Sequence, residues 1–346
     1  MKDFGLRPAK ERAEIIEQTS ATLKIGRPSI VEKDFWVCWV LLQLYGSSNP
    51  FLNESGTHPI LFKGGTSLSK VYNLIDRFSE DVDLTIDRTV LVDSAKHPDE
   101  ERISTNERLR RIDTVSSECE KYLKEKVLPY LNAKIEELGA GMAEVDETDR
   151  QLIRFTYPQS LKSDSYGGGA YVNTEIRLEF GARGEIWPAK QGKVSPYIAL
   201  AFPNLFPQPS VDVMALSAER TFWEKATILH AIAQSGNVGN GERQSRHYAD
   251  LATIWRSKIG ASAAKDVSLL ESVARHKTRY FPKASARYDL ARPGTLRLVP
   301  SVGIIKQLEG DYARMREMYI NDPPSFKEII DTLATLEAEI NKASPS

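Results

Sequence analysis

The sequence is poor in the features that mark secreted and membrane proteins. Its 346 residues include only two cysteines, Cys38 and Cys119, too few for a disulfide framework or a cysteine-rich zinc site. No run approaches the roughly 20 uncharged apolar residues that a membrane span requires. The charged N-terminus, MKDFGLRPAKERAEIIEQ, lacks the apolar core of a signal peptide. We therefore expect a cytoplasmic protein with no membrane partner.

A large excess of charge of one sign is also missing. The chain has 46 lysines and arginines against 47 aspartates and glutamates, which gives a formal net charge of −1. This balance argues against a protein that coats nucleic acid by charge alone, although it is compatible with a local basic surface. With 41% hydrophobic and 27% charged residues, the composition is that of a globular protein of one large or two ordinary domains.

The hydrophobic pattern predicts strands and helices in the first 210 residues and helices afterwards. A helix that is apolar nearly all round is expected after Pro28, opening with a capping box at Ser29 and Glu32 and ending at Gly46. A strand in HPILFKGG should lead into the helix TSLSKVYNLI, and 187–209 should be an ordered connector. The other strands are expected at 79–87, 151–157 and 173–180, and the other helices at 100–138, from 217, at 246–255, 302–319 and 325–341. The fold class is therefore α+β, with a catalytic domain over 1–210 and a helical domain over 211–346.

Two glycines and two aspartates are brought to one end of the expected sheet. Gly64 and Gly65 follow a strand and open a helix, where backbone N–H groups can hold phosphates. Asp81 and Asp83 lie two residues apart on the next strand, so both carboxylates point to the same face. Paired carboxylates suit Mg²⁺, which prefers oxygen ligands. Each feature alone is common, but together they predict a site for a metal ion and a nucleotide.

This combination resembles the polymerase β-like nucleotidyltransferase superfamily, although the fifteen residues between Gly65 and Asp81 slightly exceed its commonest spacing. The full string GGTSLSKVYNLIDRFSEDVDL resembles a narrower group, the AbiEii/AbiGii toxin family. Similar segments continue along most of the chain from about residue 30, namely EKDFWVCWVL, RLEFGARGEIWP, AERTFWEKATILHA and SRHYADLATI. The resemblance implies a mixed sheet flanked by helices, a nucleoside triphosphate as substrate and Mg²⁺, or alternatively Mn²⁺, as cofactor.

The resemblance also implies a metal-binding set of carboxylates. Asp81 and Asp83 would be the first two members, and they would be catalytic. The third would come from a following strand and could act as general base. We choose Glu179 because it lies in the matching LEFGAR segment. Glu175 on the same strand face could do the same work, and Glu179 could instead pair with Arg183.

The family's later motifs imply two further catalytic residues, Lys225 and Asp250, contributed by the helical domain. Lys225 is suited to a triphosphate, but it could also form an exposed helix pair with Glu224. Asp250 could equally be a helix-face carboxylate paired with Arg246 or His247. The residues expected to contact the nucleotide are Lys63, Gly64, Gly65, Thr66, Ser67 and Lys225, while the nearby cations Lys70 and Arg77 could contact phosphate or face solvent.

The segment 274–300 is the most informative about the acceptor. It contains seven lysines and arginines against one acid, Asp289, with Tyr280, Phe281 and Tyr288 interleaved. Cations for phosphates and aromatic rings for unpaired bases favour recognition of single-stranded or terminal RNA, although a solvated basic face has the same pattern. The candidate RNA-binding residues are Arg275, Lys277, Arg279, Lys283 and Arg287.

Studied relatives in the toxin family add nucleotides to the 3′ end of tRNA, so the resemblance makes tRNA the leading acceptor. It also implies a cognate antitoxin encoded nearby, which need not bind the toxin. Two alternatives stay open at this point. The same site could nucleotidylate or phosphorylate a protein hydroxyl, or the protein could bind nucleotide or RNA without catalysis.

Overall fold

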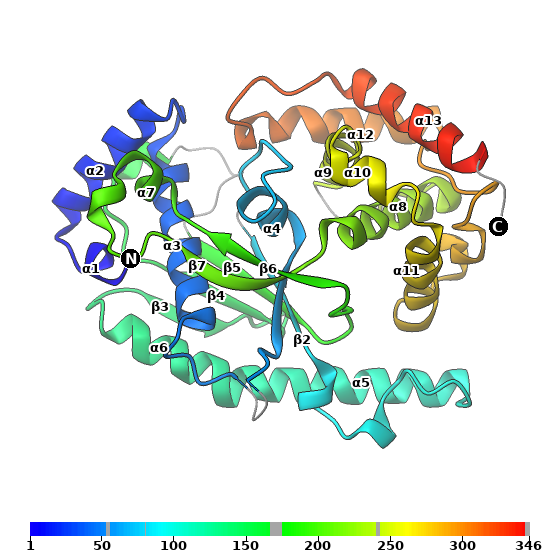
Figure 1. Cartoon of the computed structure of the whole chain (residues 1–346), viewed down its shortest axis with the longest axis horizontal. Coiled ribbons are helices and arrows are strands. Elements are labelled where there is room, and N and C mark those ends of the chain that lie inside the picture. Colours follow the sequence, from blue (N-terminus) through cyan, green and yellow to red (C-terminus); the bar gives the residue numbers. More distant parts are fainter. Residues whose placement is uncertain (53–55, 80, 167–174, 240–242, 343–346) are drawn as a thin grey trace. The chain divides into compact units, whose positions relative to one another are not determined.

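The computed structural model describes residues 1–52, 56–79, 81–166, 175–239 and 243–342 (Figure 1). The chain divides into two compact units. The first consists of Met1–Tyr72 and Phe78–Leu216, and the second of Asn73–Arg77 and Ser217–Ser346. The short segment Asn73–Arg77 therefore belongs with the C-terminal part of the chain.

The first unit contains a mixed sheet, whose described strands number seven in the order β3-β4-β5-β2-β1-β7-β6. β1 pairs with β7 and β2 with β5 in parallel, whereas the other neighbours are antiparallel. This sheet and its flanking helices confirm the α+β fold class. The strands are β1 (Ile60–Lys63), β2 (Asp81–Ile86), β3 (Met142–Val145), β4 (Leu152–Thr156), β5 (Glu175–Gly181), β6 (Ala189–Val194) and β7 (Val211–Leu216).

The alternating sequence of β5 gives the sheet one apolar and one polar face. Its even-numbered residues from Ile176 to Phe180 are buried, while the alternate residues Glu175, Arg177 and Glu179 are half-buried. The predicted strand 173–180 is thus confirmed from residue 175 onward, and residues 173 and 174 lie outside the described part of the chain. The polar face is the one that carries the candidate site.

Helix α3 (Pro28–Tyr45) covers the apolar face, as its nearly all-apolar sequence predicts. The ring centroids of Trp36 and Trp39 lie 6.0 and 5.6 Å from that of Phe155 on β4. The expected capping box at its start is wrong, because the Glu32 carboxylate is buried and accepts hydrogen bonds from Ser160 and Tyr166 instead. The helices α1 (Lys2–Gly5), α2 (Ala9–Thr22) and α7 (Tyr197–Ala201) complete this side of the unit.

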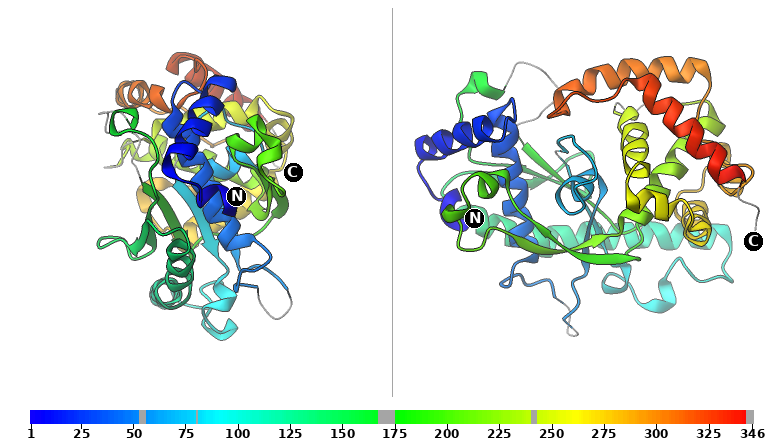
Figure 2. Two further views of the ribbon diagram at one scale, coloured as in Figure 1. Left: turned by 90° about the vertical axis from the view of Figure 1, so that its left-hand side faces the viewer. Right: turned by 45° about the horizontal axis from the view of Figure 1, so that its top comes forward.

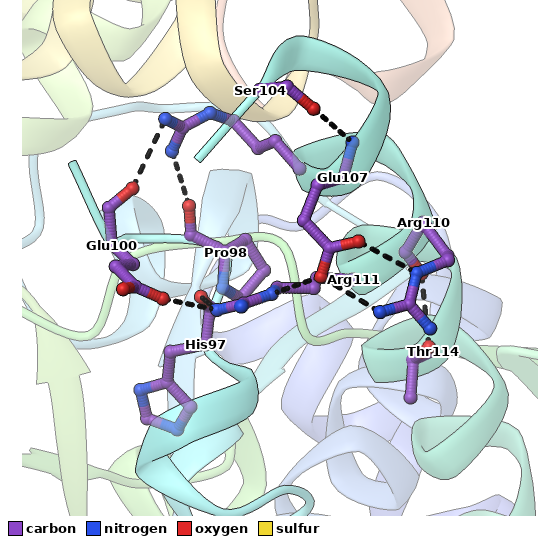
Figure 3. A network of polar contacts seen from close by, with 9 residues as sticks. His97, Pro98, Glu100, Ser104, Glu107, Arg110, Arg111 and Thr114 are labelled. Atoms are coloured by element: carbon purple, nitrogen blue, oxygen red, sulfur yellow. Dashed lines mark hydrogen bonds and ion pairs between the residues drawn. The ribbon is translucent and has the colours of Figure 1, made fainter. Parts of the chain in front are cut away.

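The predicted long helix at 100–138 is confirmed as α5 (Thr105–Tyr122) and α6 (Leu128–Glu136), joined by a π-helical turn at Leu123–Val127. Pro129 lacks the N–H that would continue regular α-helical bonding, which accounts for the wider turn before it. A polar network fixes the preceding segment to α5. Arg111 donates to His97 O and the Glu100 carboxylate, and Glu107 accepts from Arg110 and Arg111 (Figure 3).

Three other expectations in this unit need correction. Helix α4 spans Gly64–Lys70, so it begins two residues before the expected helix 66–75 and ends five residues before its end. It cannot continue through Asn73, because this residue has a left-handed φ of 50° and the segment 73–77 belongs to the second unit. Strands β3 and β7 were not anticipated. The expected connector 187–209 contains β6 and α7. β6 was missed because its sequence, AKQGKV, is polar for a strand at the edge of a sheet.

The second unit is helical in its described residues, as predicted. α8 packs against α10 and α11, and α9 packs against α8, α12 and α13 (Figure 2). The expected capping box at the start of the last helix is confirmed, since Glu328 N donates to Ser325 Oγ and Ser325 N to the Glu328 carboxylate. The helices are α8 (Ala218–Ser235), α9 (Ser245–Trp255), α10 (Lys258–Ala263), α11 (Val267–Tyr280), α12 (Val302–Arg314) and α13 (Phe326–Lys342).

Candidate active site

The turn between β1 and α4 brings the backbone of Gly64 close to the carboxylate of Asp83. Gly64 has a φ of +75°, and a Cβ at this position would lie 1.9 Å from Asp83 Oδ2. Only glycine therefore allows the Asp83 carboxylate to lie against the start of α4 while the backbone keeps this conformation. In the antiparallel register Asp83 is opposite Lys63, the last residue of β1.

The hydroxyls of Thr66 and Ser67 hold this turn in place. The Thr66 hydroxyl donates to Ser79 O at 3.2 Å and is also hydrogen-bonded to Asp81 O, while Ser67 Oγ donates to Gly64 O at 3.0 Å. Both side chains are buried. Their hydroxyls thus connect the first turn of α4 to itself and to the start of β2, and the predicted contacts of Thr66 and Ser67 with a nucleotide stay predictions.

Three carboxylates share the polar face of the sheet next to this turn. In the parallel pairing of β2 with β5, Asp81 is opposite Arg177 and Asp83 is opposite Glu179. Glu175 lies two residues before Arg177, beyond the residues of β5 that pair with β2, and is opposite Thr156 of β4 instead. The register therefore favours Glu179 over Glu175 as the neighbour of the two aspartates.

A guanidinium group stands among these acids. Arg177 Nε lies 3.8 Å from Asp81 Oδ1, and Arg177 Nη2 lies 3.6 Å from Glu179 Oε1. Within the described residues, no group of three or more His, Cys, Asp and Glu side chains is gathered closely enough to hold a metal ion. The all-oxygen set of Asp81, Asp83 and Glu179 nevertheless has the donor chemistry of a Mg²⁺ site, and glycine at position 64 leaves room for one of these carboxylates.

The cations near the turn differ in their surroundings. In the described part of the chain, no carboxylate oxygen lies within 4.0 Å of the Lys63 ammonium, and a Cβ on Gly184 would lie 3.3 Å from it. By contrast, Lys70 Nζ is buried 2.6 Å from Asp34 Oδ1 and lies over the Tyr197 ring. The expectation that Lys70 contacts phosphate or faces solvent is therefore wrong, because this lysine is neutralised inside the unit.

A second cluster of charges lies inside the helical unit. Arg77 Nε and Nη2 donate to the two carboxylate oxygens of Asp250, each at 2.8 Å, and Lys225 Nζ donates to Asp250 Oδ2 at 2.8 Å. Burial alone would raise the pKa of Asp250, but Arg77 and Lys225 hold this pKa well below its usual range. The pKa of Lys225 is lowered by burial, although Asp250 opposes this effect.

This cluster overturns three sequence interpretations. Asp250 pairs with Arg77 and Lys225 rather than with Arg246 or His247. Lys225 is buried, and Glu224 is the ion-pair partner of Arg220, so the exposed Glu224–Lys225 pair is wrong. Arg77 is likewise buried and does not face solvent. The pairing of Arg77 with Asp250 was not predicted. The sequence feature that could have drawn attention to Arg77 is its position in the string GGTSLSKVYNLIDRFSEDVDL, four residues before Asp81.

The predicted RNA-binding residues lie on α11 and the segment that follows it. Arg275, Lys283 and Arg287 are exposed, whereas Lys277 and Arg279 are half-buried, with Lys277 Nζ 4.8 Å from the Phe281 ring centroid. Arg287 forms an ion pair with Asp289 at 2.9 Å. Tyr280 is only 2% exposed, so its expected role in stacking on a base is wrong for this arrangement.

Comparison with known proteins decides the family. A family model described as nucleotidyl transferase AbiEii toxin, type IV toxin–antitoxin system, matches residues 50–332. The chain belongs to the AbiEii family. It is accordingly a nucleotidyltransferase, and the matched range contains every predicted catalytic residue from Asp81 to Asp250. The similar segment EKDFWVCWVL lies before the matched range.

Among solved structures, this AbiEii-family chain is similar to MenT4, nucleotidyltransferase toxin Rv2826c from Mycobacterium tuberculosis H37Rv. The two share 15% sequence identity with a TM-score of 0.43, over 93% of this chain and 98% of that chain. No curated protein matches the sequence. No helix of the described residues has both the length and the apolar composition to cross a membrane.

Proposed function

We propose that this AbiEii-family enzyme transfers a nucleoside monophosphate from a nucleoside triphosphate to a hydroxyl at the 3′ end of an RNA, with tRNA as the leading acceptor. The proposal depends chiefly on the polar face of the sheet, where Asp81, Asp83 and Glu179 lie beside the glycine turn. The family supplies the nucleotidyl transfer, and these residues supply a chemically suited place for it.

Asp81, Asp83 and Glu179 would hold Mg²⁺, with Mn²⁺ as a chemically similar substitute. When bound, the ion would offset the charge of the triphosphate and lower the pKa of the attacking hydroxyl. The backbone at Gly64 and Gly65 can approach phosphate oxygens closely because neither residue has a side chain. Lys63 adds an ammonium group that no described carboxylate neutralises.

The reaction requires one proton transfer and one exchange of bonds at the α-phosphorus. The acceptor oxygen forms a bond to the α-phosphorus, the bond from that phosphorus to the bridging oxygen breaks, and pyrophosphate leaves. Glu179, whose side chain is 40% exposed, is our candidate to accept the hydroxyl proton. In the helical unit we propose Lys225 for binding the triphosphate and Asp250 for orienting that lysine, since both oxygens of Asp250 are already engaged.

The basic segment of the helical unit supports an RNA acceptor. Arg275, Lys283 and Arg287 are exposed within one stretch of the chain, and the Phe281 ring is 38% exposed. Exposed cations can bind phosphates, and an exposed ring can stack on an unpaired base. As a member of a type IV toxin–antitoxin family, the enzyme would also have a cognate antitoxin that limits its action.

Acceptor labelling tests the proposal. Purified protein, Mg²⁺ and each α-labelled nucleoside triphosphate are incubated with total RNA and, separately, with total protein from bacteria. We expect label at RNA 3′ ends, in the tRNA size range. Label that appears only in protein would contradict the RNA assignment and favour a protein hydroxyl as acceptor.

Charge reversal tests the basic segment itself. The double variant Arg275→Glu, Lys283→Glu should raise the KM for RNA, because it replaces two candidate phosphate-binding cations by acids. The KM for the nucleotide should stay unchanged, because the nucleotide is assigned to other residues. Lys327→Glu changes another exposed lysine, on α13, and is the matched control that should leave both constants near those of the wild type. Equal effects of the double variant and the control would remove the segment from the RNA-binding surface.

A further inference from the structure

Arg177 is a basic residue that lies between Asp81 and Glu179, two of the predicted metal ligands. It lies opposite Asp81 in the parallel register and two residues before Glu179 on the same face of β5. Its guanidinium is within 3.8 Å of one carboxylate and 3.6 Å of the other. Both distances exceed the roughly 2.7–2.9 Å of a direct charge-assisted hydrogen bond. Arg177 is thus an electrostatic neighbour of both acids without being fixed to either.

The neighbouring strand explains why Arg177 is directed toward these acids. On β4, the residue opposite Arg177 is another arginine, Arg154. Arg154 is already engaged by Glu144 at 2.7 Å and Asp146 at 3.3 Å. Two arginines directly opposite each other repel, and the acids on the β3 side pair with Arg154. The acids nearest to Arg177 on its other side are those of the proposed metal site.

A divalent ion and this guanidinium compete for the same negative charge. Mg²⁺ binds carboxylate oxygens at about 2.0–2.1 Å, so an ion held by Asp81 and Glu179 would lie within a few ångströms of Arg177. Two positive charges at that separation repel strongly near a protein surface.

We propose that Arg177 is the resident counter-cation of the metal site: it offsets the charge of Asp81 and Glu179 in the metal-free protein and must move away when the divalent ion binds. Arg177 consequently weakens metal binding and sets the metal concentration at which the enzyme becomes active. The inference rests on the proposed function only in taking Asp81, Asp83 and Glu179 as the ligands. Arg177 is a positioning residue and not itself a ligand.

Metal binding without nucleotide tests this inference. The full-length protein is titrated with Mn²⁺, and free Mn²⁺ is followed by electron paramagnetic resonance. Arg177→Gln should bind Mn²⁺ about tenfold more tightly than the wild type, because one nearby positive charge is lost. Arg177→Lys keeps the charge and should stay within about twofold of the wild type. The Mg²⁺ concentration for half-maximal activity should fall in Arg177→Gln by a similar factor.

Arg154→Gln is the matched control, since it removes the same charge one strand further from the site. Its Mn²⁺ affinity should change by less than about twofold, because Glu144 and Asp146 already screen Arg154. Unchanged or weaker Mn²⁺ binding in Arg177→Gln would overturn the inference while leaving the proposed function intact. Binding that survives Asp83→Asn undiminished would instead overturn the metal site, and the inference with it.

Discussion

At the scale of single residues, Asp250 organises the buried charge of the helical unit. Its carboxylate is 1% exposed and is shared by Arg77 and Lys225. Both oxygens of this carboxylate accept hydrogen bonds inside the unit, one at Oδ1 and two at Oδ2. We therefore propose that Asp250 contributes by holding Lys225, so that the two later motif residues act through this contact.

Asp250→Asn should destabilise the protein by about 3 to 5 kcal/mol, because it removes the buried carboxylate that Arg77 and Lys225 share. Denaturant unfolding of the full chain measures this loss. Asp331→Asn, which removes the exposed partner of Lys327, is the control and should leave the unfolding midpoint unchanged. Similar midpoints for both variants would contradict a buried, charge-compensating role for Asp250.

The sequence predicted where the candidate residues lie along strands better than which residues they pair with. The motif spacing placed Asp81 and Asp83 on one face of a strand, and the register of β2 with β5 brings Glu179 opposite Asp83; their catalytic roles stay predictions. The partners of Asp250 could not be predicted, because Arg77 lies 173 residues away in the chain. Pairing at that separation depends on the tertiary fold, which local patterns do not encode.

At the scale of elements, the β1–α4 turn determines where the carboxylate of Asp83 can lie. Gly64→Ala should introduce left-handed strain of about 1 to 2 kcal/mol and in addition displace Asp83, since its Cβ would overlap the carboxylate. We expect loss of nucleotidyl transfer together with lowered stability. Transfer assays and thermal unfolding, carried out on the same preparation, measure the two effects.

The variant Gly139→Ala tests backbone strain without the displacement of a neighbouring side chain. Gly139 has a φ of +72°, close to that of Gly64, but nothing lies within 4 Å of its Cβ position. This variant should lose similar backbone stability and keep full activity. If both variants retained activity, the close packing of Gly64 against Asp83 would have no catalytic importance.

Helix α8 is fixed to the segment after α11 by a neutral histidine. Arg297 N donates to His230 Nδ1 at 3.0 Å, so His230 Nε2 carries the proton and donates to Arg287 O at 2.9 Å. Burial lowers the pKa of His230, with smaller effects from its neighbours. Protonation would place an N–H at Nδ1 against the Arg297 N–H and break this contact. Because both ring nitrogens bond to backbone groups, the ring serves as a structural contact.

This histidine makes stability depend on pH in a defined direction. Because the folded pKa lies below the unfolded value of about 6.5, the unfolded chain binds more protons as the pH falls below that value. Wild-type stability should therefore decline more steeply between about pH 7 and pH 5 than that of His230→Gln. Chemical unfolding at several pH values measures the difference, and parallel pH profiles would contradict the assignment.

Helices and strands with a strong hydrophobic period were predicted well. Features that depend on contacts with other parts of the fold were not. The apolar helix α3 and the strand β2 follow from their own residues. The capping box at Ser29 failed because Glu32 finds Ser160 and Tyr166, which the local sequence cannot reveal. Strand β6 was missed for a related reason, since a polar edge strand is stabilised mainly by hydrogen bonds to β7.

At the scale of the whole molecule, the two units are not simple consecutive pieces of the chain. The sequence suggested a boundary between 210 and 211, whereas the compact units separate after Leu216, and the segment Asn73–Arg77 belongs to the second unit. This segment gives the helical unit both the Arg77 side chain and a backbone bridge between Arg77 and Tyr319. No change in composition marks such a segment, because it lies inside a motif.

A fragment that begins at Ser217 should consequently fold poorly by itself. Without Arg77, Lys225 is the one cation among the described residues of the fragment that pairs with Asp250. We therefore expect a broad, weakly cooperative thermal transition. A synthetic peptide of residues 72–78 in excess should raise the melting temperature by mass action. A fragment that unfolds sharply and ignores the peptide would contradict the assignment of this segment to the helical unit.

The central claim is that the carboxylate face beside Gly64 transfers a nucleotidyl group. Its most direct test is a parallel reaction with α-labelled and γ-labelled nucleoside triphosphates, Mg²⁺ and total RNA, using the wild type and Asp83→Asn. The account predicts that the α-label alone enters RNA and that the folded Asp83→Asn variant transfers none. Transfer of the γ-label, or full transfer by Asp83→Asn, would contradict it.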